Sequence, residues 1–314
     1  MLQSLFLLYQ EISYDSNSCW DSNLQNYPKK FSITLSVDCL NELNLKRNIL
    51  PNENPYEFKF LTIFINDLKD TILLNGCGFF VISGKELSNF NKTEVVNIYK
   101  IISKIIGELL VQNKEKQTIV EIKDIGLTMN KGGRYHQTKE GGSFHTDGSH
   151  LYKNPPDYVG LLCINPAKTG GVSKFISGYK IHEKLSVDES LLKILYEKFH
   201  HDKKNENLDS QDLTRFEPIF EIINNQLKFK YQRELIFTGH EKVNQPLTIL
   251  QIKAIEFLEE ILKDPKLVVE YDLKSNDMMF SNNRWLIHDR TPFDDYEDDS
   301  LKRLLLRTWI REIN

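Results

Sequence analysis

Cysteine is scarce in this chain of 314 residues, and the few cysteines lack the spacing of a functional motif. The four are far apart and form no CxxC pair, which excludes a disulfide framework and a cysteine-rich zinc site. They are Cys19, Cys39, Cys77 and Cys163. We therefore expect buried, reduced thiols and a cytoplasmic protein.

Long apolar runs are also missing. No stretch of about eighteen apolar residues occurs, so the sequence predicts no transmembrane helix and no membrane partner. The N-terminal segment 1–10 is apolar, but it lacks a basic stretch, and the acidic residues Glu11 and Asp15 follow directly. This order of charges argues against a secretory signal.

An excess of positive charge is absent as well. The 40 Lys and Arg residues are outnumbered by 44 Asp and Glu residues, which gives a formal net charge of -4. The lysines are scattered among acidic residues and form no basic run. This pattern excludes the electrostatic signature of a nucleic-acid-binding or membrane-surface protein.

The first part of the chain, 1–117, has the pattern of a mostly helical layer. Apolar residues recur at helical spacing across 56–74, and Asn75-Gly76 predicts the end of that helix. A second amphipathic helix is predicted at roughly 92–112. Residues 15–55 are rich in Asn, Ser and Pro, and we expect them to run over the surface.

From residue 118 onward the pattern changes to short strands separated by turns. Helical segments near 178–198 and 246–263 interrupt it, and we expect an insertion at about 178–265. Helices followed by many short strands favour an α+β fold on a sandwich or jelly-roll barrel, with 1–314 as a single domain. The expected strands are 77–83, 118–128, 142–147, 158–164, 172–177, 219–223, 227–231, 267–271, 277–288 and 302–311.

Metal-binding residue types occur together in Gly141-Gly-Ser-Phe-His-Thr-Asp-Gly148. On a strand, residues two apart point to the same face, so His145 and Asp147 are expected to project into one space. An imidazole and a carboxylate at this spacing form part of a facial metal site. An isolated HxD arises often by chance, so a second cluster is needed to support the interpretation.

That second cluster lies near the C-terminus. An apolar strand ends at His288, and Arg303 and Arg307 follow about fifteen residues later. Strand spacing places both arginines on one face, with Leu304 and Leu306 on the other. Buried guanidinium groups are costly without an anion, and they bind carboxylates through two parallel hydrogen bonds. A dicarboxylate co-substrate would meet this need, whereas an edge strand would leave both arginines in solvent.

Five short sequence motifs follow one another from roughly Asp124 onward. They are His145-Thr-Asp147, Pro155-Pro156, Gly170-Gly171-Val-Ser173-Lys-Phe175, His288-x-Arg-x-x-Phe293 and Arg303-x-x-x-Arg307. Together they resemble the taurine dioxygenase and clavaminate synthase-like Fe(II)/2-oxoglutarate oxygenases. The resemblance implies a double-stranded β-helix, a cupin-like jelly roll, with flanking helices and a helical N-terminal layer.

The resemblance also implies roles for particular residues. His145, Asp147 and His288 would bind Fe(II), because two imidazoles and a carboxylate leave three coordination positions open for the keto acid and dioxygen. Ser173 and Arg303 would hold the distal carboxylate of 2-oxoglutarate. Arg307 would face the other end of 2-oxoglutarate or an anionic group of the substrate.

Substrate-binding residues are harder to assign. The segment before the metal strand contributes to substrate binding in relatives, which makes Tyr135 and Gln137 candidates. Arg233 follows the expected strand 227–231 and points inward if the strand phase continues. His150 is interpreted as a loop residue that does not bind the metal, and His136 is expected on the segment at the edge of the pocket.

The resulting hypothesis is hydroxylation of an unactivated carbon of a small polar or carboxylated metabolite, such as an amino acid or derivative, with release of succinate and CO2. Desaturation or cyclisation of a carrier- or peptide-bound substrate is an alternative. A non-catalytic, cupin-like metal and ligand sensor and a zinc hydrolase remain open from other classes. Halogenation is disfavoured, because Asp147 occupies the position that halogenases vacate.

Overall fold

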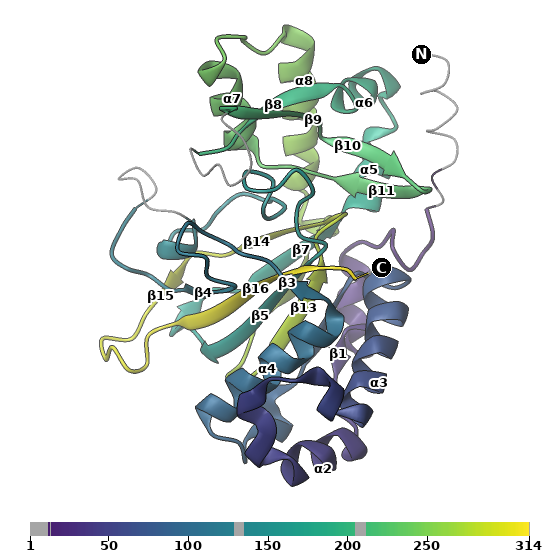
Figure 1. The fold of residues 1–314 in the computed structure, drawn as a ribbon. Coiled ribbons are helices and arrows are strands. Elements are labelled where there is room, and N and C mark those ends of the chain that lie inside the picture. Colours follow the sequence, from purple (N-terminus) through teal and green to yellow (C-terminus); the bar gives the residue numbers. More distant parts are fainter. Residues whose placement is uncertain (1–11, 13, 129–134, 205–211, 314) are drawn as a thin grey trace.

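The computed structural model describes residues 12, 14–128, 135–204 and 212–313, and it is an α+β protein (Figure 1). N-terminal helices lie at one end, two sheets occupy the middle, and a mixed layer of helices and strands lies at the other end. The expected α+β class is confirmed. No helix in the described ranges has the length and apolar character needed to cross a bilayer.

Three helices form the N-terminal layer: α2 (Val37–Leu45), α3 (Lys59–Leu68) and α4 (Lys92–Ile106). A capping box between Asn91 and Glu94 fixes the start of α4, because each side chain accepts from the other residue's backbone N–H. The apolar faces of these helices pack against the large sheet. The expectation that 15–55 only runs over the surface is wrong, because α2 buries Cys39 and Leu43 in this core.

The large sheet has the strand order β1-β2-β13-β5-β16-β3, and β4 also pairs with β16. The smaller sheet has the order β12-β7-β14. Along the chain, strands alternate between the sheets, from β5 to β7 and from β12 through β13 and β14 to β16. The bounds are β1 Ser32–Ile33, β2 Phe79–Ile82, β3 Glu108–Leu109, β4 Ile119–Ile122, β5 Tyr158–Asn165, β7 Ser173–Ser177, β12 Val269–Tyr271, β13 Met278–Asn282, β14 Leu286–Arg290 and β16 Leu304–Arg311.

Alternation along β16 decides which side chains enter the space between the sheets. Leu304 and Leu306 pack with the core beneath the N-terminal helices, whereas Leu305 belongs to the core between the sheets. Arg303 and Arg307 line the same cavity as Leu305. The prediction that the two arginines share a face opposite Leu304 and Leu306 is confirmed.

Two expected strands differ in the structure. The segment 277–288 is divided between β13 in the large sheet and β14 in the small sheet, with a buried turn at Asn283. The segment 142–147 is no regular strand; His145 forms an isolated antiparallel bridge with His288. Each of these two residues donates its backbone N–H to the other's carbonyl at 3.0 Å.

Between β7 and β12 the chain forms the layer at the top of Figure 1, opposite the N-terminal helices. We call it the insertion layer. Its apolar side chains join the core between the sheets. Helix α7 and strands β8 and β9 were not expected from the sequence. The elements are α5 Gly178–Leu185, α6 Glu189–Leu195, β8 Lys198–Asp202, β9 Thr214–Pro218, β10 Phe220–Ile223, β11 Gln226–Phe229, α7 Arg233–Lys242 and α8 Ile249–Leu262; β6 Thr169–Gly170 and β15 Phe293–Asp294 pair beside the sheets.

Candidate metal centre and adjoining pockets

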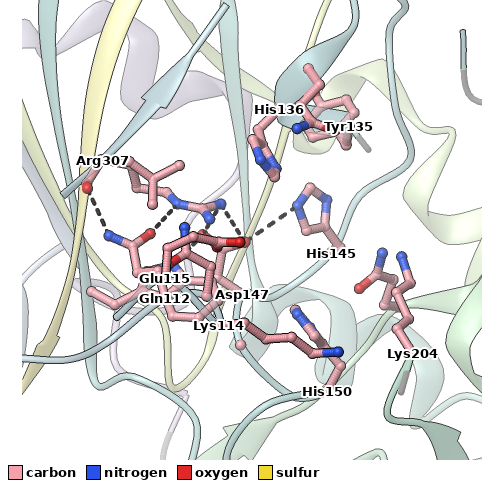
Figure 2. A pocket seen from close by; sticks show the side chains of 16 residues that line it. Gln112, Lys114, Glu115, Tyr135, His136, His145, Asp147, His150, Lys204 and Arg307 are labelled. Carbon is pink, nitrogen blue, oxygen red and sulfur yellow. Dashed lines mark hydrogen bonds and ion pairs between the residues drawn. The ribbon is translucent and has the colours of Figure 1, made fainter. Parts of the chain in front are cut away.

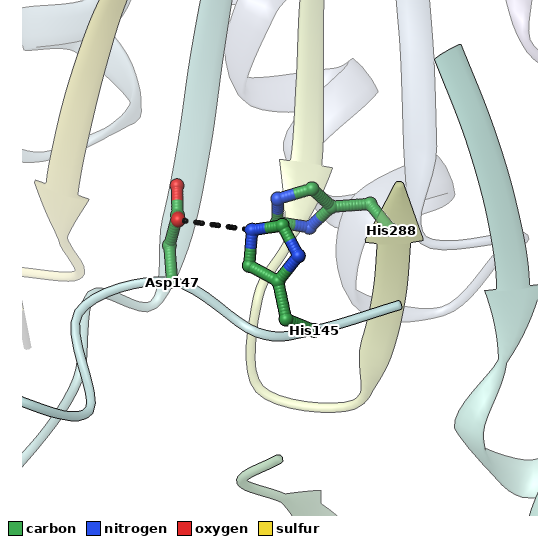
Figure 3. A group of neighbouring side chains, drawn as sticks. All are labelled: His145, Asp147 and His288. Carbon is green, nitrogen blue, oxygen red and sulfur yellow. Dashed lines mark ion pairs between the residues drawn. The ribbon is translucent and has the colours of Figure 1, made fainter. Parts of the chain in front are cut away.

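Three residues from two distant parts of the sequence converge between the sheets. His145, Asp147 and His288 each offer one ligand atom, and these atoms lie within 4.8 Å of one another (Figure 3). Nε2 of His145 is 3.7 Å from Oδ1 of Asp147. The backbone bridge between His145 and His288 brings the two rings to a centroid distance of 4.6 Å. The donor set is that of a facial site for a divalent transition metal.

Local contacts leave the histidine nitrogens suited to metal binding. Nδ1 of His145 lies 2.8 Å from the carbonyl oxygen of Ser143, so Nδ1–H donates and Nε2 keeps its lone pair. Burial, and then the neighbouring His145, lower the pKa of His288 to about 4. His288 is therefore neutral near pH 7, as a metal ligand must be.

Asp147 is held as a carboxylate by its neighbours. Burial alone would raise its pKa, but Arg307, followed by the two histidines and Trp309, holds the pKa below its ordinary range. The indole N–H of Trp309 donates to Oδ2 at 2.9 Å, and Nη1 of Arg307 lies 3.3 Å from the same oxygen. These contacts fix the orientation of Asp147 and direct Oδ1 towards the histidines.

Asn283 positions the backbone of Asp147, a role that no local sequence pattern indicates. Its Oδ1 accepts the backbone N–H of Asp147 at 2.8 Å, and its Nδ2 donates to the carbonyls of Asp147 and Pro156 at 3.0 and 2.9 Å. The neighbouring residue in the motif, Thr146, is tied to the insertion layer instead. Its N–H donates to the carbonyl of Tyr231 at 2.9 Å, and its hydroxyl accepts the N–H of Tyr231 at 3.0 Å.

Asn283→Ala is expected to weaken Fe(II) binding by about 10- to 100-fold, the range measured for lost outer partners of metal ligands. The loss of three hydrogen bonds lets the Asp147 backbone move. Anaerobic Fe(II) titration of the purified protein measures the effect. Asn282→Ala is the matched control: it removes a buried bond to the Leu73 carbonyl but leaves Asp147 untouched. Equal weakening in both variants would contradict a specific role for Asn283.

Beside the histidines lies a small cavity of about 60 Å³ with an anion-binding character. Ser173, Arg290 and Arg303 all line it, together with His288. Arg303 is only 4% exposed, and its Nη1 has no hydrogen-bond partner among the described residues. Burial, and then the nearby Arg290, lower the pKa of Arg303 to about 10. A buried cation with an unpaired donor indicates that an anion belongs in this cavity.

Aromatic and glycine contacts hold the two guanidinium groups in place. Phe293 lies 4.7 Å from Cζ of Arg290 and 4.9 Å from Cζ of Arg303, measured to the ring centroid. Gly171 has a φ of +72°, and a Cβ there would come within 3.0 Å of Nε of Arg303. Glycine is therefore required at this position both for its backbone conformation and for the close approach of Arg303.

Arg290 belongs to the motif His288-x-Arg-x-x-Phe293, but its role could not be assigned from the sequence. Its Nη2 donates to the carbonyls of Thr138, at 3.1 Å, and Glu140. Its guanidinium also lies 4.8 Å from the ring centroid of Tyr135. Arg290 thus connects the anion cavity to segment 135–140. Its position in strand register opposite Ser173 could not be inferred from the sequence.

Tyr135 and Gln137, the substrate candidates, lie at the mouth of the metal centre. Both line a larger cavity of about 350 Å³ that reaches His145 and Asp147 (Figure 2). The Tyr135 hydroxyl donates to Asp289 at 3.1 Å, and its ring packs edge-on to His145 with a centroid distance of 5.3 Å. The roles of these two residues towards a substrate stay predictions.

The strand-phase expectation for Arg233 is wrong. The strand ends at Phe229, and Arg233 is the first residue of helix α7, where it is exposed and packs over Phe237. It lines neither of the two cavities next to the metal centre. Arg307 does line both cavities, but its guanidinium already contacts Asp147 and donates to Oε1 of Gln112 at 2.8 Å.

A family profile and a named relative each match most of this chain. A family profile described as "Taurine catabolism dioxygenase TauD, TfdA family" matches residues 57–309. The "FR-33289 synthase" of Streptomyces rubellomurinus is 27% identical over 248 residues, which cover 77% of this chain and 71% of that protein.

Solved structures of similar fold include two oxygenases. An asparagine oxygenase in complex with Fe(II), 2S,3S-3-hydroxyasparagine and succinate has a TM-score of 0.68 at 14% identity, over 90% of this chain and 93% of that chain. The non-heme iron oxygenase OrfP in complex with Fe and alpha-ketoglutaric acid has a TM-score of 0.61 at 13% identity, over 89% and 94%. At such identities the likeness concerns the fold.

Proposed function

Because the chain belongs to the TauD/TfdA family of taurine catabolism dioxygenases, and is therefore an Fe(II)- and 2-oxoglutarate-dependent oxygenase, we propose that it hydroxylates an unactivated carbon of a small polar metabolite. One observation carries the proposal: a His-Asp-His cluster adjoins a buried arginine whose Nη1 has no partner in the described chain. We also propose that the alternating strands of the two sheets form a double-stranded β-helix.

In this proposal His145, Asp147 and His288 hold Fe(II). The donor chemistry fits, because His145 presents Nε2, His288 is neutral and Asp147 is ionised. When bound, iron with 2-oxoglutarate and dioxygen supplies an oxidant strong enough to replace a C–H hydrogen by hydroxyl, with release of succinate and CO2. The protein contributes orientation and the exclusion of water.

Arg303 and Ser173 are proposed to bind the distal carboxylate of 2-oxoglutarate. The unpaired Nη1 of Arg303 and the hydroxyl of Ser173 are both buried donors that line one cavity beside His288. A carboxylate there would satisfy the charge that burial disfavours. Arg290, which lines the same cavity, adds positive charge and favours a dicarboxylate over a monocarboxylate.

The substrate would enter the larger cavity, with its reacting carbon near His145 and Asp147. Tyr135 and Gln137 line this cavity and would orient the substrate. An amino acid or derivative is the substrate class that we propose, and the asparagine- and arginine-derived ligands named for the relatives of similar fold support it. Arg307 would act mainly on the orientation and ionisation of Asp147.

Anaerobic titration of the metal-free protein with Fe(II) and then 2-oxoglutarate tests the proposal. Chelation of 2-oxoglutarate to Fe(II) in a site of two histidines and one carboxylate gives a weak visible charge-transfer band. We expect the band in the wild type and its loss in His145→Ala. Folded wild-type protein that binds iron but yields no band would refute the assignment.

A further inference from the structure

Segment 135–140 contributes its first three residues to the wall of the larger cavity. Apart from a single 3-10 turn over Tyr135–Gln137 it has no regular secondary structure, so contacts from other parts of the chain must fix its position. The backbone N–H groups of Lys123 and Ile125, just beyond β4, donate to carbonyls of this turn at 3.1 Å each. The turn is therefore attached to the large sheet, and the rest of the segment depends on other anchors.

Arg290 anchors the second half of the segment. Its Nη2 donates to the carbonyls of Thr138, at 3.1 Å, and Glu140. Thr138 is fully buried, so its carbonyl would be a costly unsatisfied acceptor without this donor. The backbone N–H of Phe293 donates to the carbonyl of Lys139 at 3.1 Å and adds one further contact. The position of the second half thus depends on how the Arg290 side chain is held.

The same guanidinium lines the anion cavity, where a second cation lies close by. Arg290 is 6% exposed, and its Nε has no hydrogen-bond partner among the described residues. Phe293 contacts the guanidinium groups of both Arg290 and Arg303. Burial lowers the pKa of Arg290 although acidic neighbours act against it, and burial followed by Arg290 lowers that of Arg303. Two cations beside a cavity of about 60 Å³ repel each other, and an anion between them would remove that cost.

We infer that Arg290 is a positioning residue that couples the anion cavity to segment 135–140, so that bound 2-oxoglutarate stabilises this wall of the larger cavity. The inference rests on the proposed function for the identity of the anion. A dicarboxylate beside the two guanidinium groups favours the conformation in which Arg290 binds the carbonyls of Thr138 and Glu140. The coupling is reciprocal: a substrate that fixes the segment tightens the binding of 2-oxoglutarate by the same factor.

Amide hydrogen exchange of peptides that cover 135–140 tests the coupling. The anaerobic Fe(II) protein is compared with and without 2-oxoglutarate, at a concentration that saturates the charge-transfer band. We expect 2-oxoglutarate to slow exchange of this segment in the wild type by about fivefold or more, the lower end of typical couplings between two sites. Helix α2 is the internal reference, because it packs in the N-terminal core and should respond only to global stabilisation.

Two variants of Arg290 separate coupling from binding. In Arg290→Met the band should persist, because Arg303 and Ser173 remain, but 2-oxoglutarate should no longer slow exchange of the segment. Arg290→Lys keeps the buried charge but lacks the planar fork of donors, so the slowing should fall below about twofold while the band is retained. The lysine variant decides the question if Arg290→Met does not fold.

Tyr135→Phe is the matched control, because it loosens the same segment at a different anchor. It removes the 3.1 Å bond from the Tyr135 hydroxyl to Asp289 and leaves the Arg290 side chain in place. Exchange should be faster in both states, with the wild-type ratio between them. Equal loss of that ratio in Tyr135→Phe, or a wild-type ratio in the Arg290 variants, would overturn the inference. A wild-type band with unaltered exchange refutes the coupling alone, whereas a wild type without the band refutes the proposed function and the coupling with it.

Discussion

Asp147→Gly is expected to bind Fe(II) at least about a hundredfold more weakly than the wild type, beyond the 10- to 100-fold that outer partners of metal ligands contribute. The substitution removes one ligand and also leaves Arg307 without its carboxylate. A buried guanidinium next to the metal then repels the cation. Fe(II) affinity, measured by anaerobic titration, reports both effects together.

Small ligands can separate those two effects. In Asp147→Gly, the indole N–H of Trp309 and Nη1 of Arg307 still point into the vacated space, so formate should bind there and restore part of the iron affinity. Imidazole should not. In His145→Gly the preference should reverse, with rescue by imidazole and none by formate. Rescue of either variant by both compounds, or formate rescue that survives Arg307→Met in the Asp147→Gly background, would contradict the assigned geometry.

Arg303→Met should raise the 2-oxoglutarate concentration for half-maximal activity by roughly a hundredfold or more, because loss of one partner of a buried ion pair costs about 3–5 kcal/mol. The same variant without 2-oxoglutarate should melt at the wild-type temperature or above it. In the wild type this side chain is a buried cation whose Nη1 has no described partner and whose pKa is lowered to about 10, first by burial and then by Arg290.

Thermal unfolding with and without 2-oxoglutarate measures both parts of this prediction. The wild type should be stabilised by the keto acid, and Arg303→Met should lose that stabilisation. Lys302→Met is the control, because the neighbouring Lys302 pairs with Asp299 at the surface and should affect neither quantity. A strong fall in the melting temperature of the ligand-free Arg303→Met protein would assign Arg303 a structural role instead.

The sequence predicted the parts of the site that depend on local periodicity. The two-residue alternation of β16 identified the shared face of Arg303 and Arg307, because a strand has only two faces. The proximity of His145 and Asp147 was also expected, although they lie on an irregular segment with a single bridge rather than on a strand. An extended backbone is sufficient for that spacing.

Long-range contacts account for what the sequence could not predict. Asn283 supports Asp147 only because a turn between two sheets brings together residues 136 positions apart. Arg290 reaches segment 135–140 through backbone carbonyls, which carry no sequence signal. Arg233 was misplaced for a local reason: a helix begins where strand alternation was extrapolated.

The contacts of Thr146 limit which parts of the chain can be shortened, and they affect how the chain unfolds. Three consecutive residues are bound to three different regions: His145 to strand β14, Thr146 to Tyr231 in the insertion layer, and Asp147 to the turn at Asn283. Removal of the insertion layer would leave buried polar groups of Thr146 without partners, which disfavours any shorter chain that keeps the same metal motif. A ligand bound by this tripeptide also stabilises the regions that hold it. The metal centre and the insertion layer are therefore expected to open as one cooperative unit.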